Sequence, residues 1–341
     1  MDGTHAGTDA GTHAEASGGA RDGTGRRLAD LHAMWRIRAL EEKIRELRVA
    51  DGGNGDVVGS VHLCIGQEAG PVGACSELEP GDALFATYRG HGWALARGVP
   101  AESMIAELAG RESGVNGGRG GSAYFTAPEH GFHGENSIVG AGLPIAVGAA
   151  LAGRFDGSGR VAMTVCGDGA LNQGASHEAL NMAAAFRLPV VFVCENNYWS
   201  ELTPIDEMVG EPELWRRAAG YGMAGERVDG NDPAAVRAAV RAAVQRARSG
   251  EGPTLLELMT QRLVGHYIGD VEQYRRPGEL DRAREEEPIA RLGRSLAAEG
   301  VPAADIEDAR TRAQAEIERA AEAALAAPPA DPRTAKDHVY A

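Results

Sequence analysis

The fold of this 341-residue chain is decided by residues 160–203, RVAMTVCGDGALNQGASHEALNMAAAFRLPVVFVCENNYWSELT. Val161 to Cys166 is a short apolar run, which is typical of a strand covered on both faces. Gly167-Asp168-Gly169 ends that run, and a helix is predicted after it. Val190 to Cys194 predicts a second buried strand, which ends at Glu195-Asn196-Asn197. The pattern therefore indicates one strand–helix–strand unit of an α/β fold.

The helix in the middle of this unit is predicted to bury one stripe of small and apolar side chains. The members of the stripe are Ala175, Ala179, Met182, Ala183 and Phe186. Successive parallel strands joined by a helix end at the same edge of the sheet, where α/β folds bind ligands. We therefore expect Asp168 and Asn197 to project into one crevice.

A carboxylate and an amide oxygen are hard ligands that suit Mg²⁺ or Ca²⁺. Mg²⁺ commonly takes one or two protein oxygens and completes its octahedron with water and phosphate oxygens. The glycines around Asp168 would let a diphosphate approach the backbone. Two other interpretations exist. A nicotinamide site fits less well because the turn is not GxGxxG, and an aspartate that merely caps the next helix stays open for Asp168 alone.

Composition describes an ordinary globular protein, with 43% hydrophobic and 24% charged residues. The formal net charge of −15 disfavours nucleic acid and anionic membrane surfaces as partners. The four cysteines form no CxxC or metal cluster, which indicates a reduced, cytoplasmic protein. Residues 1–25 lack the apolar core of a signal peptide, and no apolar run is long enough to span a membrane.

The rest of the chain is predicted to continue the α/β pattern. Residues 1–27 are polar and glycine-rich and should form a disordered tail, so the expected single domain is 28–341. Helices are predicted at 27–50, 101–108, 143–155, 211–220, 233–249 and 282–327, the last broken near Gly300. Strands are predicted at 84–87, near 227–229 and at 253–260. We expect a mainly parallel sheet flanked by helices, with a helical C-terminal part.

GDG followed by 26 residues and NN resembles the motif of thiamine diphosphate enzymes, and the surrounding sequence resembles the α subunit of two-chain 2-oxoacid dehydrogenase E1 enzymes. Further segments that resemble this family are HLCIGQEA, YRGHG, the stretch ending in SIVG, and GHYIGD. The resemblance covers about residues 28–341. It implies a thiamine diphosphate-binding fold, with thiamine diphosphate and Mg²⁺ as cofactors.

The resemblance also assigns roles to single residues. Asp168, Asn197 and the main-chain carbonyl of Trp199 would bind Mg²⁺. The residues expected at thiamine diphosphate are His62, Tyr88, Arg89, Ser137, Val139, Asp168, Gly169, Ala170, Asn197 and His266. His62 and His266 are the expected catalytic residues.

Three features depart from the family pattern. Ala123-Tyr124 stands where the family has Met-His, and Glu201 stands where an apolar side chain props the bent cofactor. No serine lies between His266 and Arg276, so the phosphorylation switch of some relatives is expected to be absent.

The function implied by the resemblance is that of an E1 α subunit, active only with a β subunit in an α₂β₂ assembly. It would cleave a pyruvate-like 2-oxoacid or acetoin and pass the acyl unit to a lipoyl-bearing acyltransferase. Two alternatives stay open: a biosynthetic thiamine diphosphate enzyme that forms carbon–carbon bonds without a lipoyl partner, and a non-catalytic subunit.

Overall fold

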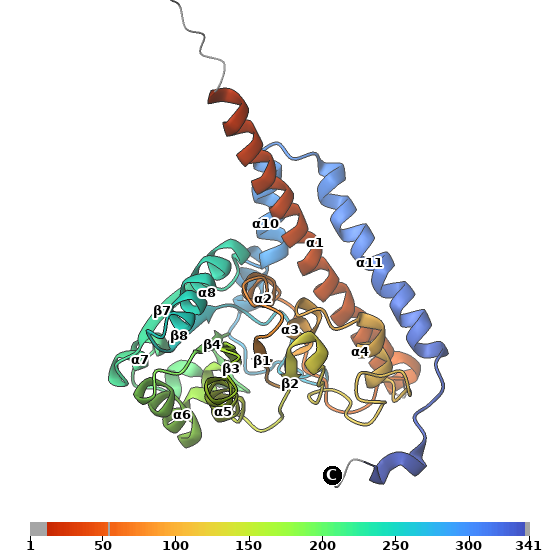
Figure 1. Cartoon of the computed structure of the whole chain (residues 1–341). Coiled ribbons are helices and arrows are strands. Elements are labelled where there is room, and N and C mark those ends of the chain that lie inside the picture. Colours follow the sequence, from red (N-terminus) through yellow and green to blue (C-terminus); the bar gives the residue numbers. More distant parts are fainter. Residues whose placement is uncertain (1–11, 54, 338–341) are drawn as a thin grey trace, which may run out of the picture.

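A six-stranded parallel sheet forms the centre of the computed structural model, which describes residues 12–53 and 55–337 (Figure 1). The strand order is β2-β1-β3-β4-β8-β7, and neighbouring strands of this sheet pair in parallel. The strands are β1 (Ala83–Phe85), β2 (Phe132–Gly134), β3 (Ala162–Gly167), β4 (Val190–Asn196), β7 (Ala224–Asp229) and β8 (Thr254–Met259). The predicted α/β fold class is confirmed.

Helices cover both faces of the sheet. They are α1 (Thr12–Gly53), α2 (Ala69–Cys75), α3 (His91–Ala96), α4 (Ala101–Leu108), α5 (Gly142–Phe155), α6 (Gly174–Ala185), α7 (Arg217–Gly220), α8 (Pro233–Arg248), α9 (Glu279–Glu285), α10 (Pro288–Ala298) and α11 (Ala303–Ala326). A separate antiparallel hairpin joins β5 (Trp199–Ser200) to β6 (Thr203–Pro204).

Alternate residues of the central strands belong to two hydrophobic clusters, one on each face of the sheet. Met163 and Val165 pack in the cluster that includes α1, α2 and α8, whereas Ala162 and Cys166 pack in the cluster of α5 and α6. All seven residues of β4 are buried. Burial on both faces explains why the strands read as continuous apolar runs rather than as an alternation of apolar and polar residues.

The C-terminal helix α11 runs beside α1, and the two long helices stand against one side of the sheet domain (Figure 1). Ion pairs link them, with Arg36 Nη2 at 2.7 Å from Glu316 Oε1 and Lys43 Nζ at 2.8 Å from Glu318 Oε1. Short 3₁₀ turns, such as Asp168–Asn172, Ile205–Glu207 and Leu214–Arg216, connect the larger elements.

Three sequence-based boundaries or faces differ from the structure. Helix α1 begins at Thr12 rather than at Arg27, so residues 12–27 of the predicted tail are helical, while residues 1–11 lie outside the described residues. In the predicted helix 211–220, only Leu214–Arg216 and Arg217–Gly220 are helical. The predicted stripe of α6 is only partly right: Ala179 and Ala183 are buried, together with Ser176 and Leu180, whereas Ala175 is exposed, Met182 is 36% exposed and Phe186 is 53% exposed.

In the part of the chain that the structure describes, no helix is both long enough and apolar enough to cross a membrane.

Candidate active site at the carboxyl edge of the sheet

A cavity of about 670 Å³ opens where β1, β3, β4 and β8 end. Each of these strands delivers polar residues to it just past its last residue, as parallel sheets do at their carboxyl edge. All the predicted site residues line this one cavity, from six separate segments of the chain. They are His62, Tyr88, Arg89, Ser137, Val139, Asp168, Gly169, Ala170, Asn197, Trp199 and His266.

The predicted metal ligands come from neighbouring strands. The β3–β4 register pairs Gly167 with Glu195, so Asp168 and Asn197 follow adjacent strand ends. Asp168 is 2% exposed. Its Oδ1 accepts a hydrogen bond of 2.9 Å from the Gly169 amide, while its buried Oδ2 has no hydrogen-bond partner. Burial raises the pKa of Asp168 to about 6. A buried carboxylate oxygen without a donor is what a cation at this position would satisfy.

The Asn197 side chain is held in one orientation. Its amide Nδ2 donates to Gln67 Oε1 at 3.2 Å, and its Oδ1 accepts from the Trp199 amide at 3.3 Å. Among the described residues no group of three or more His, Cys, Asp or Glu side chains could hold a metal ion. At the two strand ends, Asp168 and Asn197 together offer one carboxylate and one amide oxygen, the small donor set that Mg²⁺ uses when phosphate oxygens complete its shell.

Gly169 also has a packing role that the sequence did not indicate. A Cβ at Gly169 would lie 2.1 Å from Ser200 Oγ, so the β5 hairpin occupies the space beside this glycine. No atom lies within 4 Å of a Cβ at Gly167. The absence of a side chain at Gly169 thus permits the hairpin that carries Trp199 to pack against the turn that carries Asp168.

Aromatic rings from three segments meet on another wall of the cavity. The ring centroids of His62 and Tyr88 lie 4.5 Å apart, those of His62 and His266 lie 4.9 Å apart, and those of Tyr88 and His266 lie 5.9 Å apart. Burial, followed by the positive charge of Arg89, lowers the pKa of His62 to about 3 and that of His266 to about 4. Both imidazoles are therefore neutral at pH 7.

Arg89 links two segments of the site through hydrogen bonds to their backbone carbonyls. Its Nη1 donates to the Leu63 carbonyl at 2.6 Å and its Nη2 to the His266 carbonyl at 2.9 Å, and the residue is 5% exposed. Arg89 thereby ties the segment of His62 to the segment of His266. The sequence predicts Arg89 as a diphosphate ligand, and the structure adds this role because the two carbonyls face the guanidinium.

Several residues of the site were not predicted from the sequence. Arg262 is 1% exposed and follows the end of β8, where a polar residue in a parallel sheet is a recognisable signal. Glu107 accepts four backbone hydrogen bonds from the glycine-rich loop, from Asn116, Gly118, Gly120 and Gly121 at 2.6–3.1 Å. A fixed loop therefore borders the cavity beside Ala123 and Tyr124.

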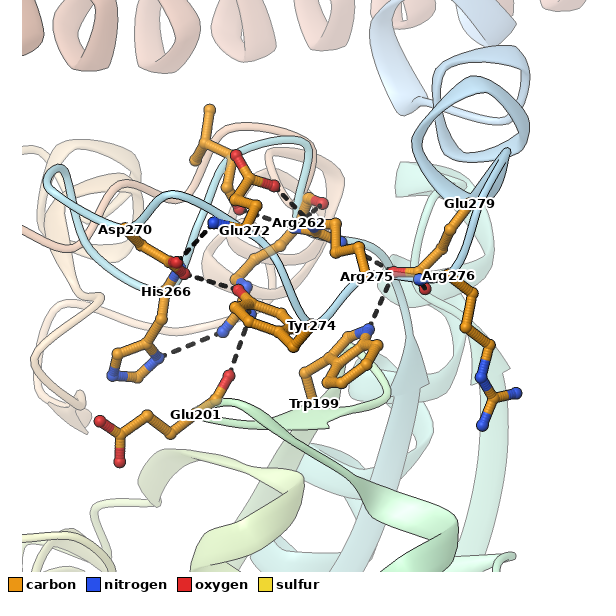
Figure 2. A network of polar contacts seen from close by, with 11 residues as sticks. Trp199, Glu201, Arg262, His266, Asp270, Glu272, Tyr274, Arg275, Arg276 and Glu279 are labelled. Carbon is orange, nitrogen blue, oxygen red and sulfur yellow. Dashed lines mark hydrogen bonds and ion pairs between the residues drawn. The ribbon is translucent and has the colours of Figure 1, made fainter.

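Glu201 lies in the turn of the β5–β6 hairpin and lines the cavity. Its φ of +55° is unusual for a residue with a side chain. The two-residue hairpin turn requires such a conformation, and Arg262 Nη2 donates to the Glu201 carbonyl at 3.2 Å. Figure 2 shows the Glu201 carboxylate extending away from Arg262. Glu201, the polar residue expected where the family has an apolar side chain, therefore does face the cavity.

This arrangement defines an α/β protein that gathers a buried carboxylate, an oriented amide and a cluster of neutral histidines at the carboxyl edge of its sheet. A model of the family described as dehydrogenase E1 component matches residues 35–333. The chain is 43% identical over 315 residues to the α subunit of acetoin:2,6-dichlorophenolindophenol oxidoreductase of Cupriavidus necator, covering 92% of this chain and 93% of that protein. It is 38% identical to the protein of that name from Bacillus subtilis, covering 86% and 89% of the two chains.

The pyruvate dehydrogenase E1 component subunit alpha of Zymomonas mobilis is also similar, with 40% identity over 301 residues, 87% of this chain and 84% of that protein. The chain belongs to the dehydrogenase E1 component family. The family resemblance identified from GDG, NN and the flanking motifs is confirmed.

Proposed function

We propose that this chain is the α subunit of a thiamine diphosphate- and Mg²⁺-dependent E1 enzyme that acts on acetoin or a pyruvate-like 2-oxoacid. The observation that carries the proposal is the meeting of Asp168, Asn197, His62 and His266 in one cavity at the carboxyl edge of the sheet. The names of the similar proteins support both substrate classes. Localisation in the reducing cytoplasm is supported by the four free, buried cysteines.

The residues present fit the cofactor. Asp168 Oδ2 and the oriented amide of Asn197 would hold Mg²⁺, together with the Trp199 carbonyl, and Mg²⁺ would hold the diphosphate. Tyr88, Arg89, Ser137, Val139, Gly169 and Ala170 would surround the diphosphate and the rings. When bound, thiamine diphosphate supplies a carbanion that adds to a carbonyl and an electron sink for cleavage of the adjacent bond.

The chain's own contribution to the chemistry is proton placement. His62 and His266 are neutral and line the same wall, with His266 buried and His62 partly buried, so each ring is uncharged when it takes part in a proton transfer. Arg89 fixes the separation of the two histidines because its guanidinium binds the carbonyls of Leu63 and His266. Tyr88 stays a neutral phenol, since burial raises its pKa. These groups would orient the substrate carbonyl and move protons at its oxygen.

We further propose a β subunit and an α₂β₂ assembly as the working state, with transfer of the acyl unit to a lipoyl-bearing acyltransferase. Support comes from the α-subunit names of the relatives. Apolar side chains on the outer surface of α5 and α6 are available for an interface, among them Phe155 at 83% and Phe186 at 53% exposure. Residues 28–341 would act in it as one domain.

The test is to co-express the chain with a candidate β chain and assay acetoin and pyruvate with an artificial electron acceptor, with and without thiamine diphosphate and Mg²⁺. The proposal expects turnover of at least one substrate that requires both cofactors. Carbon–carbon bond formation without any oxidant would support the biosynthetic alternative. Absence of thiamine diphosphate binding in the purified assembly would support a non-catalytic subunit.

A further inference from the structure

The Arg262 guanidinium and the His266 imidazole form a direct contact beside the cavity. Arg262 Nη1 lies 3.2 Å from His266 Nδ1, and Arg262 is 1% exposed (Figure 2). A guanidinium carries only donors, whereas a neutral imidazole has one donor and one acceptor nitrogen. The contact can therefore be a hydrogen bond only if Nδ1 of His266 carries no proton. The proton of the neutral ring must then reside on Nε2.

We propose that Arg262 is a positioning residue that fixes His266 as the Nε2–H tautomer, so that the free edge of the imidazole offers a donor and not an acceptor. Figure 2 shows the second ring nitrogen on the side of the imidazole away from Arg262. His266 lines the cavity. A carbonyl or alkoxide oxygen of a bound molecule would thus meet an N–H at this face, and His266 would act there as a hydrogen-bond donor or acid.

The hydrogen bonds that hold Arg262 have a consistent direction. Arg262 Nη2 donates to the Tyr274 hydroxyl at 3.0 Å, and that hydroxyl donates to Asp270 Oδ2 at 2.6 Å. The same Asp270 oxygen accepts from the His266 amide at 2.5 Å. The four residues form a closed ring in which every donor meets an acceptor. Reversing the His266 tautomer would break this ring at one point, because two donors would then face each other.

A second set of contacts fixes the backbone of Arg262. Arg275 Nη2 donates to the carbonyls of Arg262 at 3.0 Å and Val264 at 2.8 Å. Its Nη1 donates to Glu279 Oε1 at 2.9 Å, and the same oxygen accepts from Trp199 Nε1 at 2.9 Å. Glu279 therefore joins the loop that bears His266 to the hairpin that bears Trp199. Arg262 is therefore held both at its backbone, by Arg275, and at its guanidinium, by His266, Tyr274 and the Glu201 carbonyl.

The charged and titratable groups around His266 agree with a neutral ring. Burial and the two arginines Arg89 and Arg262 lower the pKa of His266 to about 4, while Asp270 acts weakly in the opposite sense. The rings in contact with the His266 imidazole are the neutral ring of His62 and the phenol of Tyr88. No imidazolium is expected at neutral pH, so the tautomer decides what His266 can do.

The first test measures the tautomer itself in the full chain, without any substrate or cofactor. The protein is labelled with ¹⁵N-histidine, and a long-range ¹H–¹⁵N spectrum is recorded at pH 7; the His266 signals are assigned by their absence in His266→Gln. The expected pattern is an unprotonated Nδ1 and a protonated Nε2. A protonated Nδ1 in the wild-type chain would overturn the proposal, whatever the activity of the enzyme.

The second test removes the donor. Arg262→Met should release the Nδ1 contact, give a mixture of tautomers and raise the His266 pKa by one unit or more toward its ordinary value. Arg262→Lys keeps a charged donor and should restore the wild-type pattern in part. Tyr274→Phe is the matched control, since it removes another partner of Arg262 and leaves the Arg262–His266 contact in place. It should keep the wild-type tautomer.

The turnover part of the test rests on the proposed function. With the β chain and cofactors, Arg262→Met should lower kcat about 10- to 100-fold, with KM within about threefold, and shift the acid limb of the pH profile upward. Unchanged His266 signals and an unchanged acid limb in Arg262→Met would contradict the proposal. If Arg262→Met does not fold, the tautomers measured in Arg262→Lys and in the wild-type chain still test the proposal. Failure of all turnover with the expected tautomer would count against the proposed function alone.

Discussion

The imidazole rings of His62 and His266 lie edge to face, with their centroids 4.9 Å apart. His62 precedes helix α2 and His266 follows strand β8, so tertiary structure alone brings them together. Arg89 donates to the carbonyl of Leu63, next to His62, and to that of His266, which fixes the spacing. Burial and this nearby positive charge keep the pKa of both rings far below 6.5, so both rings are uncharged at neutral pH.

We expect His266→Ala to fold normally and to lose about 10²–10⁴-fold in kcat, the usual contribution of a general acid or base. The fold should survive because the backbone groups of His266, rather than its ring, bind Asp270 and Arg89. Steady-state kinetics of the α–β assembly, with circular dichroism as a check of folding, measure the effect. A kcat within threefold of the wild type would mean that His266 is only a loop residue.

Asp168→Asn should stabilise the metal-free chain and abolish its stabilisation by the cofactors. The substitution removes a buried charge whose Oδ2 has no partner, while an Asn Oδ1 can keep the bond from the Gly169 amide. We expect the metal-free chain to gain about 1–3 kcal/mol in free energy of unfolding at pH 7, since the cost of burying a charge at this position is removed. The gain in stability on adding Mg²⁺ and thiamine diphosphate to the α–β assembly should disappear.

Thermal unfolding with and without the two cofactors measures both parts of this prediction. The matched control is Asp206→Asn, an exposed aspartate in a 3₁₀ turn outside the cavity lining. It should change neither quantity. An Asp168→Asn assembly that is stabilised by the cofactors as much as the wild type would remove Asp168 from the metal site.

The sequence alone could predict the strands that end at the site and the residues that follow them. Strand β3 ends at Gly167 and strand β4 at Asn196, close to the positions predicted from short apolar runs bounded by glycine and proline. The residues on the carboxyl edge followed from the parallel topology. Periodicity failed for α6, because an alanine-rich helix offers two faces with similar spacing, and only packing against α5 and the sheet selects one.

The links between distant loops could not be predicted in this way. Trp199 Nε1 reaches Glu279, and Arg262 reaches the Glu201 carbonyl; each contact depends on how two loops fold against each other. The early start of α1 at Thr12 has a different cause. Once the apolar part of a helix is packed, adding each further turn is inexpensive in free energy, so a polar extension can be helical without any amphipathic signal.

The stability of the chain should decline as the pH rises above about 6.5, in part through a buried ion pair. His91 Nδ1 lies 2.9 Å from Glu41 Oε2, and both side chains are fully buried. Burial alone would lower the pKa of His91, but Glu41 outweighs burial and raises it. Because the folded pKa is above the unfolded one, this contribution is complete below pH 6.5 and is lost as the pH passes the folded value.

Glu41→Gln should cost about 3–5 kcal/mol, because the remaining partner is left buried without its counter-ion. It should also flatten the decline between pH 6.5 and 9 in unfolding experiments. Glu46→Gln is the control on the same helix, since Glu46 is exposed and pairs only with Lys43 in the contacts of the described chain. Retention of the wild-type pH slope in Glu41→Gln would show that another group causes the decline.

Glu201 should influence which substrate reacts rather than whether the metal binds. Its carboxylate lies at the cavity while its backbone is fixed by Arg262. A negative charge there should disfavour an anionic 2-oxoacid relative to neutral acetoin. We expect Glu201→Gln, and more strongly Glu201→Met, to raise the ratio of kcat/KM for pyruvate to that for acetoin by about 5- to 50-fold, equivalent to about 1–2 kcal/mol. An unaltered ratio would place Glu201 outside the substrate pocket.

The last prediction concerns the partner subunit. The outer surface of α5 and α6, with the loop before α5, carries a group of exposed apolar side chains that no described element covers. They are Ile138, Val139, Ile145, Phe155, Met182 and Phe186. Gly148 lies on the exposed side of α5, and no atom lies within 4 Å of a Cβ placed on it. A large side chain at Gly148 would therefore fit the isolated chain and would obstruct only a partner packed closely against α5.

We expect the chain alone to be inactive, because the family resemblance assigns the glutamate that activates the cofactor to the β subunit. Gly148→Trp should leave the melting temperature of the isolated chain unchanged or slightly raised, since glycine is a poor helix former. It should weaken association with β at least 100-fold and reduce turnover accordingly. Ala323→Trp, at an exposed position of α11, is the matched control and should assemble normally. Co-purification and sedimentation measure the assembly of the two chains. A Gly148→Trp chain that binds β like the wild type would exclude this face of α5 from the interface. Full turnover by the isolated chain would require an activating glutamate within its own sequence.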